Sequence, residues 1–153
     1  MKILVFSDSH RSRAGMYDAI LAHKPDQIIH LGDLVEDAEE LSYVYPKLPV
    51  CMVPGNCDRY RCPPWVQPRL CYDVCGVRLF MTHGHKHGVK TNTAMLVAEA
   101  RAMHAQAALY GHTHIQRCEI QNGILLLNPG AAMDGHGALL EIDRHGAVSA
   151  AMY

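Results

Sequence analysis

The residues of this chain that can do chemistry lie in five short polar clusters, each next to an apolar run. Aspartate, asparagine and histidine recur in the clusters, and together they supply the mixed oxygen and nitrogen donors that hold divalent transition metals. A single Asp after a strand is commonly a helix cap, and a single His is commonly a buried core residue. Five clusters placed alike favour one shared metal site. The clusters are Asp8-Ser9-His10, Gly32-Asp33, Gly55-Asn56-Cys57-Asp58, Gly84 to His87 and Gly111 to His114.

Five apolar runs must position these clusters, and each has the composition of a buried strand. The runs span residues 3–6, 27–31, 50–53, 77–81 and 107–110. Apolar residues with helical spacing fall between them, from Ala14 to Leu21 and from about Glu36 to Tyr45. Alternating strands and helices predict parallel strands, and parallel α/β sheets bind ligands at the carboxyl ends of their strands.

The rest of the chain is mostly typical of antiparallel strands. Residues 70–75 and 77–82 are predicted to pair around Gly76, and Asn122-Gly123 is a strong signal for a two-residue hairpin. A further hairpin is predicted at 144–146, a helix at about 92–105, and an irregular loop at 55–68. We therefore predict one α/β domain over residues 1–153, with two mixed β-sheets packed face to face and helices on the outside.

The spacing inside the clusters predicts which side chains share a cation. Residues two apart in an extended segment point to the same side, so Asp8 and His10 are expected to face one ion together. The same argument applies to His112 and His114. Gly111, immediately before them, allows the close backbone approach that a crowded ion site requires.

The composition argues against several classes of protein. A formal net charge of −1 over 153 residues does not favour an extended nucleic-acid surface. No apolar stretch approaches the roughly 20 residues of a membrane span, so we expect no membrane contact and a cytoplasmic location. The six cysteines form no Cys-x-x-Cys pair and are expected to be free thiols.

The motifs, taken in order along the chain, resemble those of the calcineurin-like metallophosphoesterases. They are Asp-x-His, Gly-Asp, Gly-Asn-(His or Cys)-Asp, a Gly-flanked His and Gly-His-x-His. The short chain, the Gly-Asn-Cys-Asp sequence and Asn128-Pro129-Gly130 are most similar to the small bacterial and archaeal phosphodiesterases of the YfcE type. The resemblance implies an α/β/β/α sandwich and a small-molecule phosphoester substrate.

The resemblance also implies two divalent metal ions with Asp33 as the bridging ligand. Manganese is the predicted metal, with zinc, iron, nickel and cobalt as alternatives. The implied ligands of one ion are Asp8, His10, Asp33 and His114, and those of the other are Asp33, Asn56, His83 and His112.

The implied reaction is phosphoester hydrolysis, most simply of a diester, by in-line attack of a metal-bridging hydroxide. Asp33, Asn56, His83, Cys57 and His85 are the residues predicted to take part in catalysis. Cys57 stands where many family members carry a His thought to act as general acid. Its presence predicts either a preference for good leaving groups or a transfer of the role to His85. A small packing residue beside Asn56 is the alternative for Cys57.

Several other predictions stay open at this stage. Asp58 is predicted either to orient a ligand from outside the metal shell or to form a turn. Arg11, Arg13, Lys86 and His87 are either phosphate contacts or solvated side chains. The alternative to an enzyme is a protein-interaction scaffold like the retromer subunit of this fold, although here every motif ligand is present. A homodimer or homotetramer is expected only by analogy with relatives.

Overall fold

The computed structural model describes all residues, 1–153, and contains ten strands and three α-helices. Two short 3₁₀ turns, η1 and η2, complete the elements. The elements in chain order are β1 Lys2–Phe6, α1 Ala14–His23, β2 Gln27–His30, α2 Val35–Val44, β3 Val50–Met52, β4 Arg69–Val74, β5 Val77–Thr82, η1 His85–His87, α3 Ala94–Ala102, β6 Ala107–Leu109, β7 Gln116–Gln121, β8 Ile124–Pro129, η2 Ala132–Asp134, β9 Ala138–Ile142 and β10 Val148–Met152.

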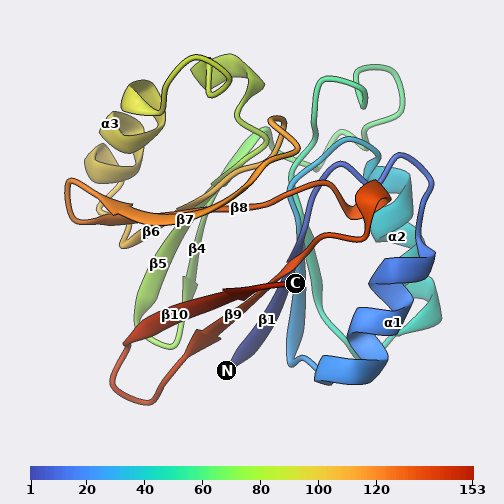
Figure 1. The fold of residues 1–153 in the computed structure, drawn as a ribbon. Helices are drawn as coiled ribbons and strands as arrows, with labels where there is room; N and C mark the ends of the chain where they lie inside the picture. The colour runs from blue at the N-terminus through green and yellow to red at the C-terminus, as the bar shows by residue number, and fades with distance from the viewer.

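The strands form two mixed five-stranded sheets that pack face to face (Figure 1). The order in the first sheet is β10-β9-β1-β2-β3, and the order in the second is β4-β5-β6-β8-β7. Helices α1 and α2 cover the outer face of the first sheet, and α3 covers the outer face of the second (Figure 1). The predicted fold class is therefore confirmed.

Each sheet contains three parallel strands, with antiparallel strands on one side of them in the first sheet and on both sides in the second. Strands β1, β2 and β3 pair in parallel, as the strand and helix alternation predicts, and so do β5, β6 and β8. The antiparallel strands near the C-terminus divide between the two sheets. Strands β9 and β10 extend the first sheet, and β7 forms an edge of the second. The carboxyl ends of β1, β2, β3, β5 and β6 consequently meet at one rim of the sandwich.

The core explains why the central strands are apolar on both faces. Ile3 and Val5 of β1 point between the sheets and pack in one cluster with Leu79 of β5 and residues of the other strands. Leu4 and Phe6, the alternate residues of β1, pack instead against α1 and α2. A strand buried on both sides must have a continuous apolar run.

The three predicted hairpins form. Residues 143–147 join β9 to β10, and the other two hairpins have two-residue turns. Cys75 and Gly76 join β4 to β5 with φ angles of 50° and 77°, and Asn122 and Gly123 join β7 to β8 with φ angles of 51° and 80°. Positive φ at both central residues is the requirement of a type I′ turn. The long segment between β3 and β4 contains no helix or strand, in agreement with the predicted loop. None of the helices is long and apolar enough to span a membrane.

Candidate metal centre

Two overlapping groups of metal-binding side chains lie at the rim where the parallel strands end. Asp8, His10 and His114 form one group, and Asp8, Asp33 and His83 form the other, with potential ligand atoms of each group within 4.8 Å of one another. Asp8 Oδ1 is 3.1 Å from His114 Nε2. Asp33 Oδ2 is 3.5 Å from His83 Nε2 and 4.0 Å from His10 Nε2, so this carboxylate faces histidines of both groups.

The remaining predicted ligands lie against these groups. Asn56 Oδ1 is 3.2 Å from His83 Nε2, and the ring of His112 is centred 5.1 Å from that of His83. The backbone N–H of His112 also donates to Asp8 Oδ2 at 3.0 Å. The structure therefore brings together all seven side chains predicted to bind metal, from five separate strand ends.

The two other predicted catalytic residues lie at the edge of the cluster. The ring of His85 is centred 5.5 Å from that of His83 and 6.1 Å from that of His112. Cys57 is exposed, and its backbone N–H donates to Asp33 Oδ1 at 2.8 Å. Partial burial, together with the hydrogen bond and charge of Asp33, raises the pKa of the Cys57 thiol to about 11. A protonated thiol does not support a nucleophilic cysteine.

The backbone at the ligands is not extended, so the premise of the two-apart argument is wrong, although Asp8 and His10 still belong to one group of candidate ligands. Asp8 and His10 have φ angles of 54° and 45°, and His112 and His114 have φ angles of 69° and 62°. Asp33 is likewise left-handed, with φ of 54°. Left-handed residues turn the chain sharply at the end of each strand, which brings the side chains to the rim. Such conformations cost of order 1 kcal/mol each and persist where surrounding contacts fix them.

The donor atoms at the rim fit divalent cations. His83 Nδ1 lies 2.8 Å from the carbonyl of Leu31, which can only accept, so this nitrogen carries a proton, and in the neutral ring Nε2 presents a lone pair. That lone pair faces oxygens of Asp8, Asp33 and Asn56. Asp8 Oδ1 is buried and makes no hydrogen bond. Without a cation, the raised pKa of His83 favours a proton on Nε2 between these oxygens, and a bound cation would take the place of that proton.

The pKa shifts reflect the same crowding of charge. Burial raises the pKa of Asp33, but the hydrogen bonds and charge from His83 and Cys57 outweigh it and hold the pKa below the usual range. Burial lowers the pKa of His83, whereas the Asp33 and Asp8 carboxylates more than offset that and raise it. Burial, then repulsion by His83, lowers the pKa of His112 to about 4, which leaves its ring neutral and able to bind a metal.

Asp58 supports the cluster from behind. Its side chain accepts three backbone N–H groups, those of Asp33 at 2.9 Å, Val35 at 2.9 Å and Gly55 at 2.7 Å. Only 2% of the residue is exposed. Of the two roles left open by the sequence, this geometry favours the positioning one, because Asp58 ties the strand ends that carry Asp33 and Asn56 to each other.

A second buried chain of hydrogen bonds was not predicted. Ser9 Oγ donates to Asp37 Oδ2 at 2.7 Å and lies 3.2 Å from His30 Nε2. His30 Nδ1 accepts from the N–H of Gly32, so Nε2 carries the proton and donates to Ser9. Burial lowers the pKa of His30 to about 4 and keeps the ring neutral. These hydrogen bonds hold the turn between the candidate ligands Asp8 and His10. The one hint of them in the sequence is the position of Ser9 between those two residues.

Asn128 is a further positioning residue that the sequence did not assign. Its buried amide donates to the carbonyl of Gly111 at 2.8 Å and to Thr113 Oγ1 at 3.0 Å. Its own oxygen accepts the N–H of Gly130 at 3.0 Å. The Asn-Pro-Gly segment at the end of β8 thereby fixes the loop that carries His112 and His114.

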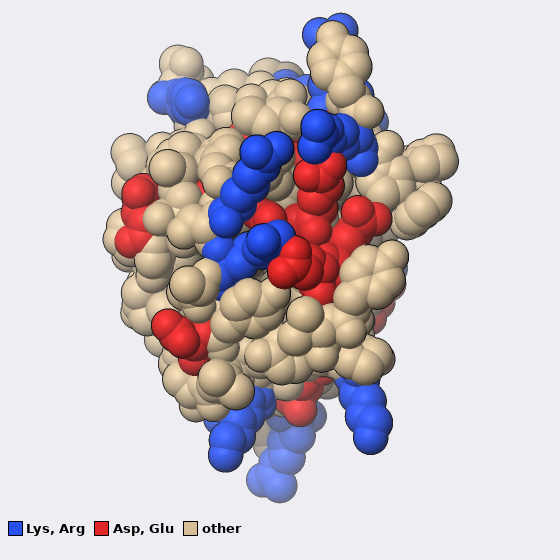
Figure 2. Space-filling model, turned by 90° about the vertical axis from the view of Figure 1, so that its right-hand side faces the viewer, with Lys and Arg blue, Asp and Glu red and all other residues tan.

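Two of the basic residues considered as phosphate contacts are engaged elsewhere. Arg13 pairs with Glu40 of α2, and His87 Nε2 lies 2.7 Å from Glu99 Oε2. Figure 2 shows acidic side chains gathered on one face of the molecule, with Lys and Arg beside them. Arg13 thus contributes to ion pairing over α2, and its position does not support a role in phosphate binding.

Comparison with known proteins decides the family. Residues 1–144 match the calcineurin-like phosphoesterase superfamily domain. The chain belongs to this superfamily. The members are metal-dependent hydrolases, and the ligand cluster described above lies inside the matched residues.

Individual relatives of this phosphoesterase agree with the assignment. A probable metallophosphoesterase of Bacillus subtilis is 31% identical over 134 residues, which cover 86% of this chain and 75% of the relative. A phosphodiesterase of Methanocaldococcus jannaschii is 25% identical over 144 residues, covering 85% of this chain and 83% of the relative.

A solved structure extends the likeness to the fold. Zinc-complexed Vps29 from Entamoeba histolytica superposes with a TM-score of 0.74 at 20% identity, over 100% of this chain and 98% of that one. At this identity the likeness shows the fold and not the function.

Gly55→Ala is expected to disrupt the metal centre of this phosphoesterase. A Cβ at Gly55 would collide with the Asp33 side chain and lie 2.8 Å from its Cγ, so the carboxylate must move. We expect the unfolding free energy to fall by about 1–3 kcal/mol. Manganese affinity should fall by at least about 10-fold. Calorimetric titration with manganese and thermal unfolding measure both effects.

Gly15→Ala is the matched control, because its added Cβ would meet nothing closer than Gly135 Cα at 3.7 Å and the residue lies in α1. It should bind metal normally and be slightly stabilised. Wild-type metal affinity in Gly55→Ala would contradict a ligand role for Asp33 in the position described.

Proposed function

We propose that this chain is a dinuclear metal-dependent phosphodiesterase. The observation that carries the proposal is the Asp33 carboxylate, which lies between two groups of histidines and faces both with one oxygen. A carboxylate can serve two cations at once, which neither an imidazole nor an amide does as readily. The proposed ligands are Asp8, His10, Asp33 and His114 for one ion, and Asp33, Asn56, His83 and His112 for the other.

Manganese is the proposed metal, because the mixed imidazole and carboxylate set suits the transition metals better than calcium or magnesium. Two divalent cations held there would supply hydroxide from water at neutral pH and neutralise charge on the phosphoryl oxygens. The reaction is in-line hydrolysis without a covalent enzyme intermediate. A cationic centre also attracts a phosphate although the chain has a net charge of −1.

The chain's own residues position the substrate and its leaving group. His85 lies beside His83 and His112, and burial followed by repulsion from His83 lowers its pKa. A lowered pKa disfavours the protonated ring that a general acid needs, so the proposed role of His85 is to donate a hydrogen bond from its ring N–H to the leaving oxygen. The sulfur of Cys57 lies 3.4 Å from Asn56 Nδ2. Because this thiol stands where relatives carry a His general acid, we propose that the enzyme favours esters with good leaving groups.

Preference for diesters is supported by the likeness to a protein named as a phosphodiesterase. A diester carries one negative charge and leaves room for substituents on two sides of the phosphorus.

Metal exchange tests the proposal directly. We expect metal-stripped protein to hydrolyse neither bis(4-nitrophenyl) phosphate nor 4-nitrophenyl phosphate. Manganese should restore diester turnover, and magnesium should restore less. The measurement is the release of nitrophenolate per bound metal, with metal content determined on the same sample.

Faster turnover of the monoester than of the diester would overturn the diester preference. If two metal ions bind and neither ester is hydrolysed, the proposed enzymatic function is contradicted and the scaffold alternative is favoured.

A further inference from the structure

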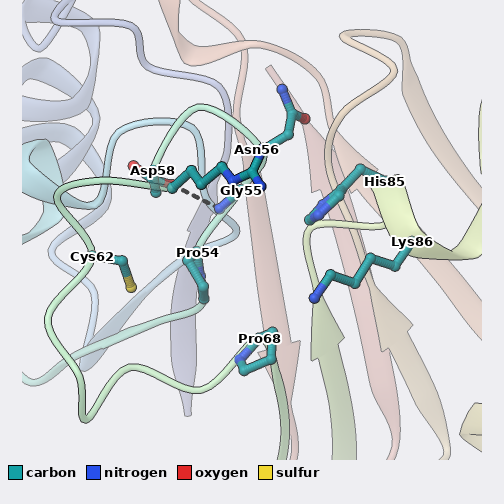
Figure 3. Close-up of a pocket in the computed structure, with 9 residues that line it drawn as sticks. Pro54, Gly55, Asn56, Asp58, Cys62, Pro68, His85 and Lys86 are labelled. Atoms are coloured by element: carbon teal, nitrogen blue, oxygen red, sulfur yellow. Dashed lines mark hydrogen bonds between the residues drawn. The ribbon is translucent and has the colours of Figure 1, made fainter.

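A cavity of about 480 Å³ opens next to the metal centre (Figure 3). It lies between the loop that follows β3 and the turn that begins at His85. Its volume is within the range of small-molecule sites, about 300–1,000 Å³. Only one of its nine lining residues is hydrophobic, and Asn56, Arg59, His85 and Lys86 bring nitrogen groups that can donate hydrogen bonds to an occupant. The lining residues are Pro54, Gly55, Asn56, Asp58, Arg59, Cys62, Pro68, His85 and Lys86.

The cavity is continuous with the proposed reaction site through two shared residues. Asn56, whose side-chain oxygen is 3.2 Å from His83 Nε2, belongs to its wall. His85, centred 5.5 Å from His83, belongs to it as well. Figure 3 shows His85 and Lys86 on one side of the cavity, across from Asn56, Gly55 and Pro54. A substituent of a phosphate held at the metals therefore has this cavity as its neighbour.

The wall carries two cations without carboxylate partners. Neither Arg59 nor Lys86 has a carboxylate oxygen within 4.0 Å, and Arg59 contacts only the Tyr60 ring among charged or aromatic partners. Arg61, two residues along the same loop, is paired with Glu36 at 3.2 Å and does not line the cavity. The one acid in the wall, Asp58, has both oxygens occupied by backbone N–H groups.

We propose that this cavity binds a second anionic group of the substrate. The preferred substrate class is then a phosphodiester that carries a further phosphate on one of its alcohol groups. The inference rests on the proposed function, because it places the scissile phosphate at the metal centre. Arg59 and Lys86 supply charge-assisted hydrogen bonds to the additional phosphate, and such bonds are stronger than neutral ones.

The test compares dinucleotides that differ by one terminal phosphate. Manganese-loaded wild-type protein should hydrolyse 5′-phosphorylated thymidylyl-thymidine with about 10-fold higher kcat/KM than thymidylyl-thymidine itself. In the double variant Arg59→Ala/Lys86→Ala that ratio should fall to about one. Arg61→Ala, from the same loop but outside the cavity, should keep the wild-type ratio and the wild-type turnover of bis(4-nitrophenyl) phosphate.

Binding provides a readout that does not depend on turnover. Thymidine 3′,5′-bisphosphate should bind the manganese-loaded protein about 10-fold more tightly than thymidine 3′-monophosphate, and the double variant should lose this difference. Equal affinities in the wild type, or a difference that survives in the double variant, would overturn the proposed anion site. Turnover of bis(4-nitrophenyl) phosphate by the same manganese-loaded protein would then leave the proposed function standing. Failure of the proposed function is recognised separately, by two bound metals without hydrolysis of any ester.

Discussion

Asp33→Asn is expected to lower manganese-restored diester turnover by more than about 100-fold, beyond the 10–100-fold typical of residues that only orient a ligand. Asparagine matches aspartate in size but has a single oxygen. Asp33 Oδ1 accepts the N–H of Cys57, while Oδ2 faces His10 and His83. Because the asparagine oxygen is needed by Cys57, the amide NH₂ would face the histidines and offer no lone pair to a cation.

Turnover, bound metal per chain and thermal stability should be measured together. We expect Asp33→Asn to bind fewer ions than the wild type and to remain folded. Asp73→Asn is the matched control, because Asp73 lies on β4 in an exposed ion pair with Arg78. It should keep activity and metal content, since such pairs contribute about 0–1 kcal/mol. Two bound ions and near wild-type turnover in Asp33→Asn would contradict the bridging role.

The sequence predicted the elements well, because their signals are local or repeated. Strand β1 contains the unbroken apolar run 3–6 because its two faces are buried against different layers. The I′ hairpin at Asn122-Gly123 is similarly encoded by two adjacent residues. What the sequence did not predict is how the antiparallel strands divide between the sheets, because neighbouring hairpins with the same pattern can extend either sheet.

The same contrast applies to the metal centre. A set of candidate ligands could be predicted because residue type and order carry the chemistry, and the structure brings all of these candidates to one rim. The left-handed backbone of Asp8 and Asp33 could not be predicted, because a single Asp in a sequence does not distinguish an αL residue from an extended one. Contacts distant in sequence fix that conformation. The backbone N–H of Asp8 donates to the carbonyl of Gly32 at 2.9 Å, and the backbone N–H of Ser9 donates to the carbonyl of Asp33 at 3.1 Å.

Asp58 illustrates how much of the site depends on such distant contacts. Asp58→Ala should lower the unfolding free energy of the metal-free protein by about 3–5 kcal/mol, because three buried N–H groups lose their acceptor at about 1–3 kcal/mol each. The melting temperature should then fall by roughly 10 °C, at about 2–4 °C per kcal/mol for a chain of this size. Metal affinity should fall about 10–100-fold, because Asp33 is no longer held in place.

Asp58→Asn separates the loss of hydrogen bonds from the loss of bulk. Its one oxygen can replace Oδ2, which serves Asp33 and Gly55, while its NH₂ opposes the N–H of Val35 that Oδ1 now accepts. We expect an effect between wild type and alanine in both stability and metal affinity. Asp26→Ala is the control, because Asp26 accepts a single exposed N–H, from Lys2 at 2.7 Å. Thermal unfolding of the stripped proteins and manganese titration measure the series. If Asp58→Ala bound manganese as tightly as the Asp26→Ala control, Asp58 would be a structural residue with no part in positioning Asp33, and the metal centre would have to be held by the turns around Ser9 and Asn128 alone.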